Sequence, residues 1–123
     1  MTSVCAAGTK TVIALPIPPT DNHLFAGRGR TRYRSDKYRS WIKEAGWILA
    51  SQRLPQAVGA VSVLIEVSER ESTDAWDLSN RHKATLDLLV EHKIIQGDNR
   101  PYVRRLAMEW ANIDGIRVTV EQI

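Results

Sequence analysis

Val61-Ser-Val-Leu-Ile-Glu-Val67 is the stretch of this sequence that decides its fold. Valine or isoleucine occupies every second position, at Val61, Val63, Ile65 and Val67. Because side chains along a β-strand point alternately to the two faces of a sheet, this alternation predicts a strand with one buried, apolar face. The other elements can be placed on either side of it.

Three further segments have strand character, and two longer segments have helical spacing. The predicted strands are residues 11–15, 61–67, 103–110 and 116–120, and the predicted helices run from Asp36 to before Pro55 and from 77–80 to about His92. The order strand, helix, strand, helix, strand, strand predicts an α+β fold in which two main helices pack on a mixed four-stranded sheet.

Length and composition exclude several classes of protein. A chain of 123 residues is typical of one domain, so we expect a single domain spanning residues 1–123. No apolar run approaches the ~20 residues that a membrane-spanning helix needs, and a secretory signal is also missing. Cys5 is the only cysteine, which excludes an internal disulfide and a cysteine-based metal cluster. We therefore expect a reducing, cytoplasmic setting without membrane contact.

Positive charge is concentrated before the first predicted helix. The formal net charge is +3, and residues 21–33, which lack a hydrophobic period, form a predicted mobile loop. The candidate DNA-binding residues in and after this loop are Arg28, Arg30, Arg32, Arg34 and Lys37. Such a basic segment favours binding to a polyanion such as nucleic acid. On charge alone, an unevenly charged, solvated surface is an equally good interpretation.

Polar residues that could carry chemistry gather at the start of the second predicted helix. Asn80, Lys83 and Asp87 are spaced three and four apart, so they share one helical face, and Asp98 follows in the loop beyond. Mg²⁺ prefers a few carboxylate oxygens plus water, and such an ion can activate water for phosphodiester hydrolysis. Spacing alone leaves other interpretations open: Asp77 could cap the helix, and the remaining residues could form a solvated stripe and a turn.

The histidines show no such pattern. His23, His82 and His92 are too widely separated for a zinc motif, and we interpret them as surface or capping residues.

Several motifs follow one another along the chain and identify a likeness to a known family. They are Ala14-Leu-Pro-Ile-Pro-Pro-Thr-Asp-Asn22, Arg28-Gly-Arg-Thr31, Asp77-Leu-Ser-Asn-x-x-Lys83, Asp87-x-Leu89 and the later Asp98. Over nearly its whole length the chain resembles the RusA family of crossover junction endodeoxyribonucleases, or Holliday junction resolvases. The family pattern at the strongest motif is Asp-x-Asp-Asn-x-x-Lys, followed by Asp-x-Leu and an acidic pair after the helix.

The resemblance implies a metal-dependent endonuclease that resolves Holliday junctions or other branched DNA by paired symmetric nicks. The implied metal-binding carboxylates are Asp77 and Asp98, with Lys83 assisting phosphate chemistry and Asn80 supporting the site by hydrogen bonding. Mg²⁺ is the implied cofactor, with Mn²⁺ as a substitute, and the implied product carries a 5′-phosphate. Cuts on two opposed strands imply a homodimer with matched sites, acting in a bacterial or phage-infected cell.

Two positions depart from the family pattern. Ser79 stands where the family usually has a second Asp, and Gly97 stands where it often has the first of two acids. The lost charge should weaken metal binding, and Asp74 is a candidate metal ligand that could compensate. The alternative function is a non-catalytic protein that keeps a RusA-like fold and binds branched DNA after its metal site has decayed. An RNA-binding module is disfavoured because no aromatic RNA-recognition motif is present.

Overall fold

The computed structural model describes residues 9–72 and 77–123, apart from the side chains of Ser79 and Asn80. Its main helices are α1 (Asp36–Ala50) and α2 (His82–Glu91). The short 3-10 helices are η1 (Asp21–His23), η2 (Gly29–Thr31) and η3 (Leu78–Arg81). The strands are β1 (Lys10–Leu15), β2 (Phe25–Ala26), β3 (Tyr33–Arg34), β4 (Val61–Ser68), β5 (Val103–Ala111) and β6 (Ile116–Gln122).

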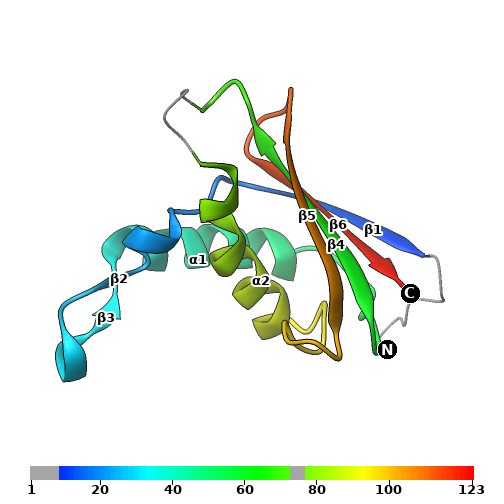
Figure 1. Ribbon diagram of the computed structural model, residues 1–123, viewed down its shortest axis with the longest axis horizontal. Helices are drawn as coiled ribbons and strands as arrows, with labels where there is room; N and C mark the ends of the chain where they lie inside the picture. The colour runs from blue at the N-terminus through cyan, green and yellow to red at the C-terminus, as the bar shows by residue number, and fades with distance from the viewer. Residues whose placement is uncertain (1–8, 73–76) are drawn as a thin grey trace.

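The main sheet has four strands in the order β1-β6-β4-β5. β6 runs antiparallel to both β1 and β4, whereas β5 runs parallel to β4. Parallel neighbours need a crossover connection, and η3 with α2 supplies it. Both helices lie on the same side of the sheet (Figure 1). The predicted α+β fold with a mixed four-stranded sheet and two main helices is therefore confirmed.

The core lies between the helices and β4. Val61, Val63, Ile65 and Val67 are each 0% exposed, as their alternation predicted. The helices cover them with one apolar stripe each, formed by Tyr38, Trp41, Ala45 and Leu49 on α1 and by Ala84, Leu86, Leu88 and Leu89 on α2. Among the described residues, no helix is long and apolar enough to cross a bilayer.

The basic segment before α1 has more structure than the predicted mobile loop. Strands β2 and β3 pair antiparallel and form a small arm that projects beyond the helices (Figure 1). Leu24 at its base is fully buried, and the Ser35 amide donates to the Leu24 carbonyl oxygen at 2.9 Å. Gly27 turns the arm with a φ of +80°, a left-handed conformation that suits glycine. The prediction failed because one buried leucine and short-range turns hold this segment without any hydrophobic period.

One ion pair lies on the sheet face that no helix covers. Arg117 on β6 donates from Nε and Nη2 to the two carboxylate oxygens of Glu66 on β4, at 2.8 and 2.7 Å. These hydrogen bonds hold the pKa of Glu66 below its ordinary value, against a smaller opposing effect of burial. The pair therefore joins the two central strands at a place where the apolar core does not reach.

Glu66→Gln is expected to lower the melting temperature near neutral pH, because an amide cannot form this charge-assisted bidentate pair. The lowered pKa means that the carboxylate stabilises the fold above its ordinary pKa and that this contribution is lost as the pH falls through the lowered value. The melting temperatures of wild type and variant should therefore converge in acid, as circular dichroism can show. A difference that stays constant down to about pH 2 would contradict this role.

Candidate functional site

Three of the predicted site residues, Asp77, Lys83 and Asp98, line two neighbouring hollows between α2 and β5. One hollow, of about 400 Å³, is lined by Lys83, Asp98 and the first half of β5, and the other, of about 460 Å³, by Asp77, Leu78 and Met108. His82 and Leu106 line both, so the two hollows adjoin. The structure therefore brings Asp77, Lys83 and Asp98 to one flank of the molecule.

Asp77 immediately precedes η3, but its side chain does not cap this helix. Its backbone is extended, and its side chain makes no capping hydrogen bond. A carboxylate that only capped the helix would accept a backbone N–H of the first turn. The capping interpretation is therefore wrong for this residue, whose side chain is exposed.

Lys83 and Asp87 form the predicted contact along α2. The Lys83 ammonium lies 3.6 Å from an Asp87 carboxylate oxygen, and both side chains are substantially exposed. An exposed pair of this kind contributes little to stability, so it leaves Lys83 free to exchange partners. Asn80, which was predicted to share this helical face, belongs to η3 rather than α2.

Part of the predicted metal site cannot be placed. Asp74 lies outside the described residues, as do the side chains of Asn80 and Ser79. Within the described ranges, no group of three or more histidine, cysteine or acidic side chains is arranged to hold a metal ion. The described part of the site thus offers two carboxylates, Asp77 and Asp98, in adjoining hollows.

His82, interpreted above as a surface or capping residue, is a member of the site that sequence reasoning missed. It is half-buried between Asp77 and Asp98, and its Nδ1 lies 3.4 Å from an Asp21 carboxylate oxygen. The other oxygen of Asp21 is buried without a hydrogen-bond partner among the described residues. A carboxylate beside one imidazole nitrogen helps to fix the orientation of the ring. Asp21 and His82 are far apart in sequence, so no spacing signal could have found the pair.

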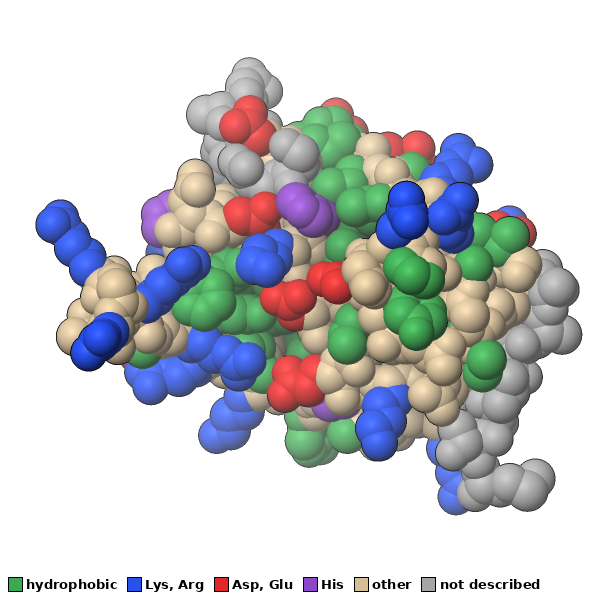
Figure 2. Space-filling view, turned by 60° about the horizontal axis from the view of Figure 1, so that its bottom comes forward, with side chains coloured by type: hydrophobic (Ala, Val, Ile, Leu, Met, Phe, Trp, Pro, Cys, Tyr) green, Lys and Arg blue, Asp and Glu red, His purple; other side chains and the backbone are tan. Residues whose placement is uncertain are grey.

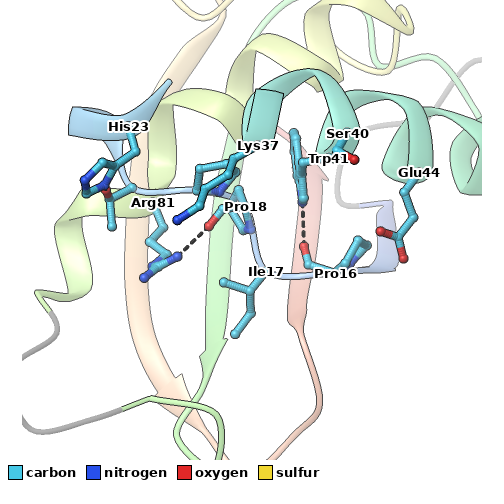
Figure 3. A pocket seen from close by; sticks show the side chains of 11 residues that line it. Pro16, Ile17, Pro18, His23, Lys37, Ser40, Trp41, Glu44 and Arg81 are labelled. Atoms are coloured by element: carbon cyan, nitrogen blue, oxygen red, sulfur yellow. Dashed lines mark hydrogen bonds between the residues drawn. The ribbon is translucent and has the colours of Figure 1, made fainter. Parts of the chain in front are cut away.

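Hydrogen bonds from η3 and α1 hold the proline-rich segment that precedes Asp21 in place. The guanidinium of Arg81, the residue before His82, donates to the Pro18 carbonyl oxygen, and Trp41 Nε1 donates to that of Pro16 at 2.9 Å. Burial lowers the pKa of Arg81, while nearby Asp21 opposes this effect. Figure 3 shows these bonds in a third hollow of about 600 Å³ whose rim includes Lys37.

The predicted DNA-binding residues lie on or beside the β2–β3 arm, and all are exposed. The guanidinium of Arg32 lies 4.4 Å from the ring centroid of Phe25, and that of Arg34 lies 5.5 Å from that of Tyr38. These cation–π contacts orient two arginines while leaving their charge accessible. Figure 2 shows basic side chains on the arm and acidic side chains gathered at the centre of the same face.

Comparison with known protein families identifies a match that covers most of the chain. The family model described as Endodeoxyribonuclease RusA matches residues 16–121 of the 123-residue chain. No curated protein matches the chain.

Gly97, one of the two departures from the family motif, is fixed by its surroundings. A Cβ atom at this position would lie 2.6 Å from Cδ2 of Tyr102 and 2.8 Å from Oδ1 of Asn99. Neither distance is compatible with an unmoved neighbour, so an acidic side chain cannot be added without displacing the Tyr102 ring. An acidic side chain at position 97 and the present position of the Tyr102 ring therefore exclude one another.

Gly97→Asp is expected to destabilise the fold by about 1–3 kcal/mol, the usual cost of overpacking. Because Tyr102 is the main obstacle, Gly97→Asp combined with Tyr102→Ala should lose less stability than the two single variants together. Urea denaturation of the three variants measures this coupling. Strictly additive losses would show that Tyr102 does not restrict position 97.

Proposed function

The chain belongs to the RusA family of endodeoxyribonucleases, and we propose that it resolves Holliday junctions and other branched DNA by paired symmetric nicks, as a metal-dependent homodimer. The observation that carries the proposal is the placement of Asp77, Lys83 and Asp98 around adjoining hollows on one flank. Acidic and basic groups together in one solvent-accessible site suit hydrolysis of a phosphodiester.

The chemistry of the donors fits a hard divalent cation. Asp77 and Asp98 present carboxylate oxygens, which Mg²⁺ and Mn²⁺ prefer, and both side chains are exposed. Asp74 and Asn80 remain proposed contributors. When bound, the cation would lower the pKa of a coordinated water and offset charge on the phosphate.

The chain's own side chains then position the DNA. In the hydrolysis, water adds to phosphorus and the bond to the 3′ oxygen breaks, which leaves a 5′-phosphate. The Lys83 ammonium offsets the negative charge that develops on the phosphoryl oxygens. His82, which lies 3.4 Å from Asp21 through Nδ1, lines both hollows and is a proposed contact of the scissile phosphate.

The β2–β3 arm is the proposed grip on the DNA backbone. The arm carries Arg28, Arg30, Arg32 and Arg34, with Lys37 at its base on α1. Contacts from such residues to phosphates fix the position of a protein on DNA without reading its sequence. This suits an enzyme that selects a branched shape.

A non-catalytic branched-DNA-binding protein is the second candidate. The observation that favours it is the packing of Tyr102 and Asn99 around Gly97, which leaves no room for the acid often present in the family unless the Tyr102 ring moves. The arm would then bind DNA as proposed, but the carboxylates would not support hydrolysis.

Asp77→Asn should reduce cleavage of a synthetic four-way junction in Mg²⁺ by about a hundredfold or more, because it removes a charged oxygen ligand. Asp114→Asn, which changes an exposed carboxylate in the turn after β5, is the matched control and should cleave normally. Paired nicks by wild type that require a divalent cation support the enzyme. Cleavage by Asp77→Asn at the wild-type rate would refute the role of this carboxylate, and junction binding without cleavage in any divalent metal would favour the second candidate.

Arg28→Gln combined with Arg30→Gln should weaken junction binding and flatten its salt dependence. The slope of log K against log salt should become less steep by about 0.9 for each arginine that contacts a phosphate of duplex DNA. A fluorescence-anisotropy titration at several salt concentrations measures the slope. Arg53→Gln, an exposed cation after α1, is the control. An unchanged slope in the double variant would rule the arm out as the phosphate grip.

A further inference from the structure

β5 forms one edge of the main sheet. Among the described strands it pairs only with β4, so its other side has no strand partner. The strand is nine residues long and leaves two large apolar side chains substantially exposed, Leu106 at 39% and Trp110 at 37%. Exposed edges of this kind are ready to pair with another chain unless the protein protects them.

The backbone of β5 is arranged for such pairing. The Glu69 amide donates to the Ala111 carbonyl oxygen at 2.9 Å, which fixes Ala111 as a residue directed toward β4. The register between β4 and β5 is unbroken from Arg105 to Ala111. Backbone groups alternate along a strand, so those of Leu106, Met108 and Trp110 point to the open edge.

When a second copy of β5 is aligned antiparallel to the first, residues of opposite charge lie opposite one another. In an antiparallel pair centred on Ala107, Leu106 lies opposite Met108, and Arg105 lies opposite Glu109. The pairing also sets Arg104 opposite Trp110, where a cation–π contact can form. We propose that β5 pairs antiparallel with β5 of a second copy of the chain, with a twofold axis at Ala107. This inference rests on the proposed homodimer and names its surface.

Charge selects this register over its neighbours. Arg105 and Glu109 are both exposed and form no salt bridge with another described residue, although Glu109 interacts electrostatically with Arg117 of its own chain. Centring the pair on Leu106 places Arg105 opposite Ala107, and centring it on Met108 places Arg105 opposite Ala111. Only the axis at Ala107 gives two opposite-charge pairs, one on each side of the axis. Directly opposite charges of unlike sign stabilise antiparallel strands.

The other edge of the sheet lacks these features. β1 contains a single charged residue, Lys10, which lies 3.9 Å from Glu121 of its own chain. Antiparallel pairing of β1 with itself therefore offers no pair of opposite charges. The edges differ in sequence, and β5 is the one suited to a second copy.

The joined sheet explains how one junction could be cut twice. A twofold axis perpendicular to the sheet leaves the α2 helices of both copies on the same face. The hollows that contain Asp77 and Asp98 lie beside β5 on that face, so the two sites would flank the axis. Matched sites on one face are what paired nicks in a single junction require.

A charge exchange tests the pairing. Arg105→Glu alone and Glu109→Arg alone each place like charges opposite one another on both sides of the axis, and each should weaken dimerisation by about tenfold to a hundredfold. The double variant Arg105→Glu/Glu109→Arg restores both opposite-charge pairs and should restore the dimer. Sedimentation velocity over a range of concentrations gives the dissociation constants, with Arg53→Glu as the control for charge reversal. Failure of the double variant to recover would overturn the inference.

A cross-link tests the register without relying on charge. The axis makes Ala107 its own partner at a non-hydrogen-bonded position, where Cα atoms lie ~4.5 Å apart, within the range that a disulfide spans. In a Cys5→Ser background, Ala107→Cys should form a covalent dimer on mild oxidation. Val12→Cys on the opposite edge strand, where Val12 is 56% exposed, should not. A cross-link through Val12→Cys but not Ala107→Cys would overturn the inference.

The outcomes separate this inference from the proposed function. A wild-type dimer that neither charge reversal weakens would place the interface elsewhere and leave the proposed homodimer intact. A wild-type chain that stays monomeric while cutting junctions in Mg²⁺ would overturn both the pairing and the homodimer but leave the nuclease. Loss of cleavage in Asp77→Asn is independent of all these results.

Discussion

The parallel pairing of β5 with β4 is the constraint on which the site depends. Parallel strands cannot be joined by a hairpin, so the chain must cross over the sheet between them, and α2 with η3 forms that crossover. The carboxylates at the two ends of this connection, Asp77 and Asp98, are thereby returned to the flank of one strand. Because β4 is fully buried on its helix-facing side, neither α2 nor β5 can shift without opening the core.

A second set of contacts joins the base of the β2–β3 arm to this crossover. Arg81 holds the proline-rich segment through Pro18, and Asp21 holds His82 at the start of α2. Both contacts occur where η1 meets η3, so the base of the arm and the first turn of α2 form one unit. Charge is distributed accordingly, with cations on the projecting arm and acids nearer the centre (Figure 2). A polyanion attracted by the arm would meet the carboxylates at the arm's base.

The fold was largely predictable because its signals are local. Alternation identified β4 and β6, helical spacing and the Ser35 cap identified α1, and the motif from Asp77 to Lys83 indicated the family. The β2–β3 arm was not predictable as structure, since it depends on burial of Leu24 rather than on a repeating pattern. His82 was missed for a related reason: its partner Asp21 is remote in sequence, and only the folded chain brings them together. From the sequence, Gly97 was interpreted only as the loss of an acidic side chain. The structure shows in addition that the Tyr102 ring occupies the space that a side chain at position 97 would need.

The claim that most needs measurement is that the carboxylates on either side of α2 share one divalent cation. Paramagnetic Mn²⁺ broadens nuclear resonances close to it, so a titration followed by amide NMR reports which residues surround the ion without any need for catalysis. Simultaneous broadening at Asp77, His82 and Asp98, at Mn²⁺ concentrations that leave Asp36 unaffected, is the expected result. Broadening at only one of the two carboxylates, or at neither before the exposed acids elsewhere, would contradict a shared metal site.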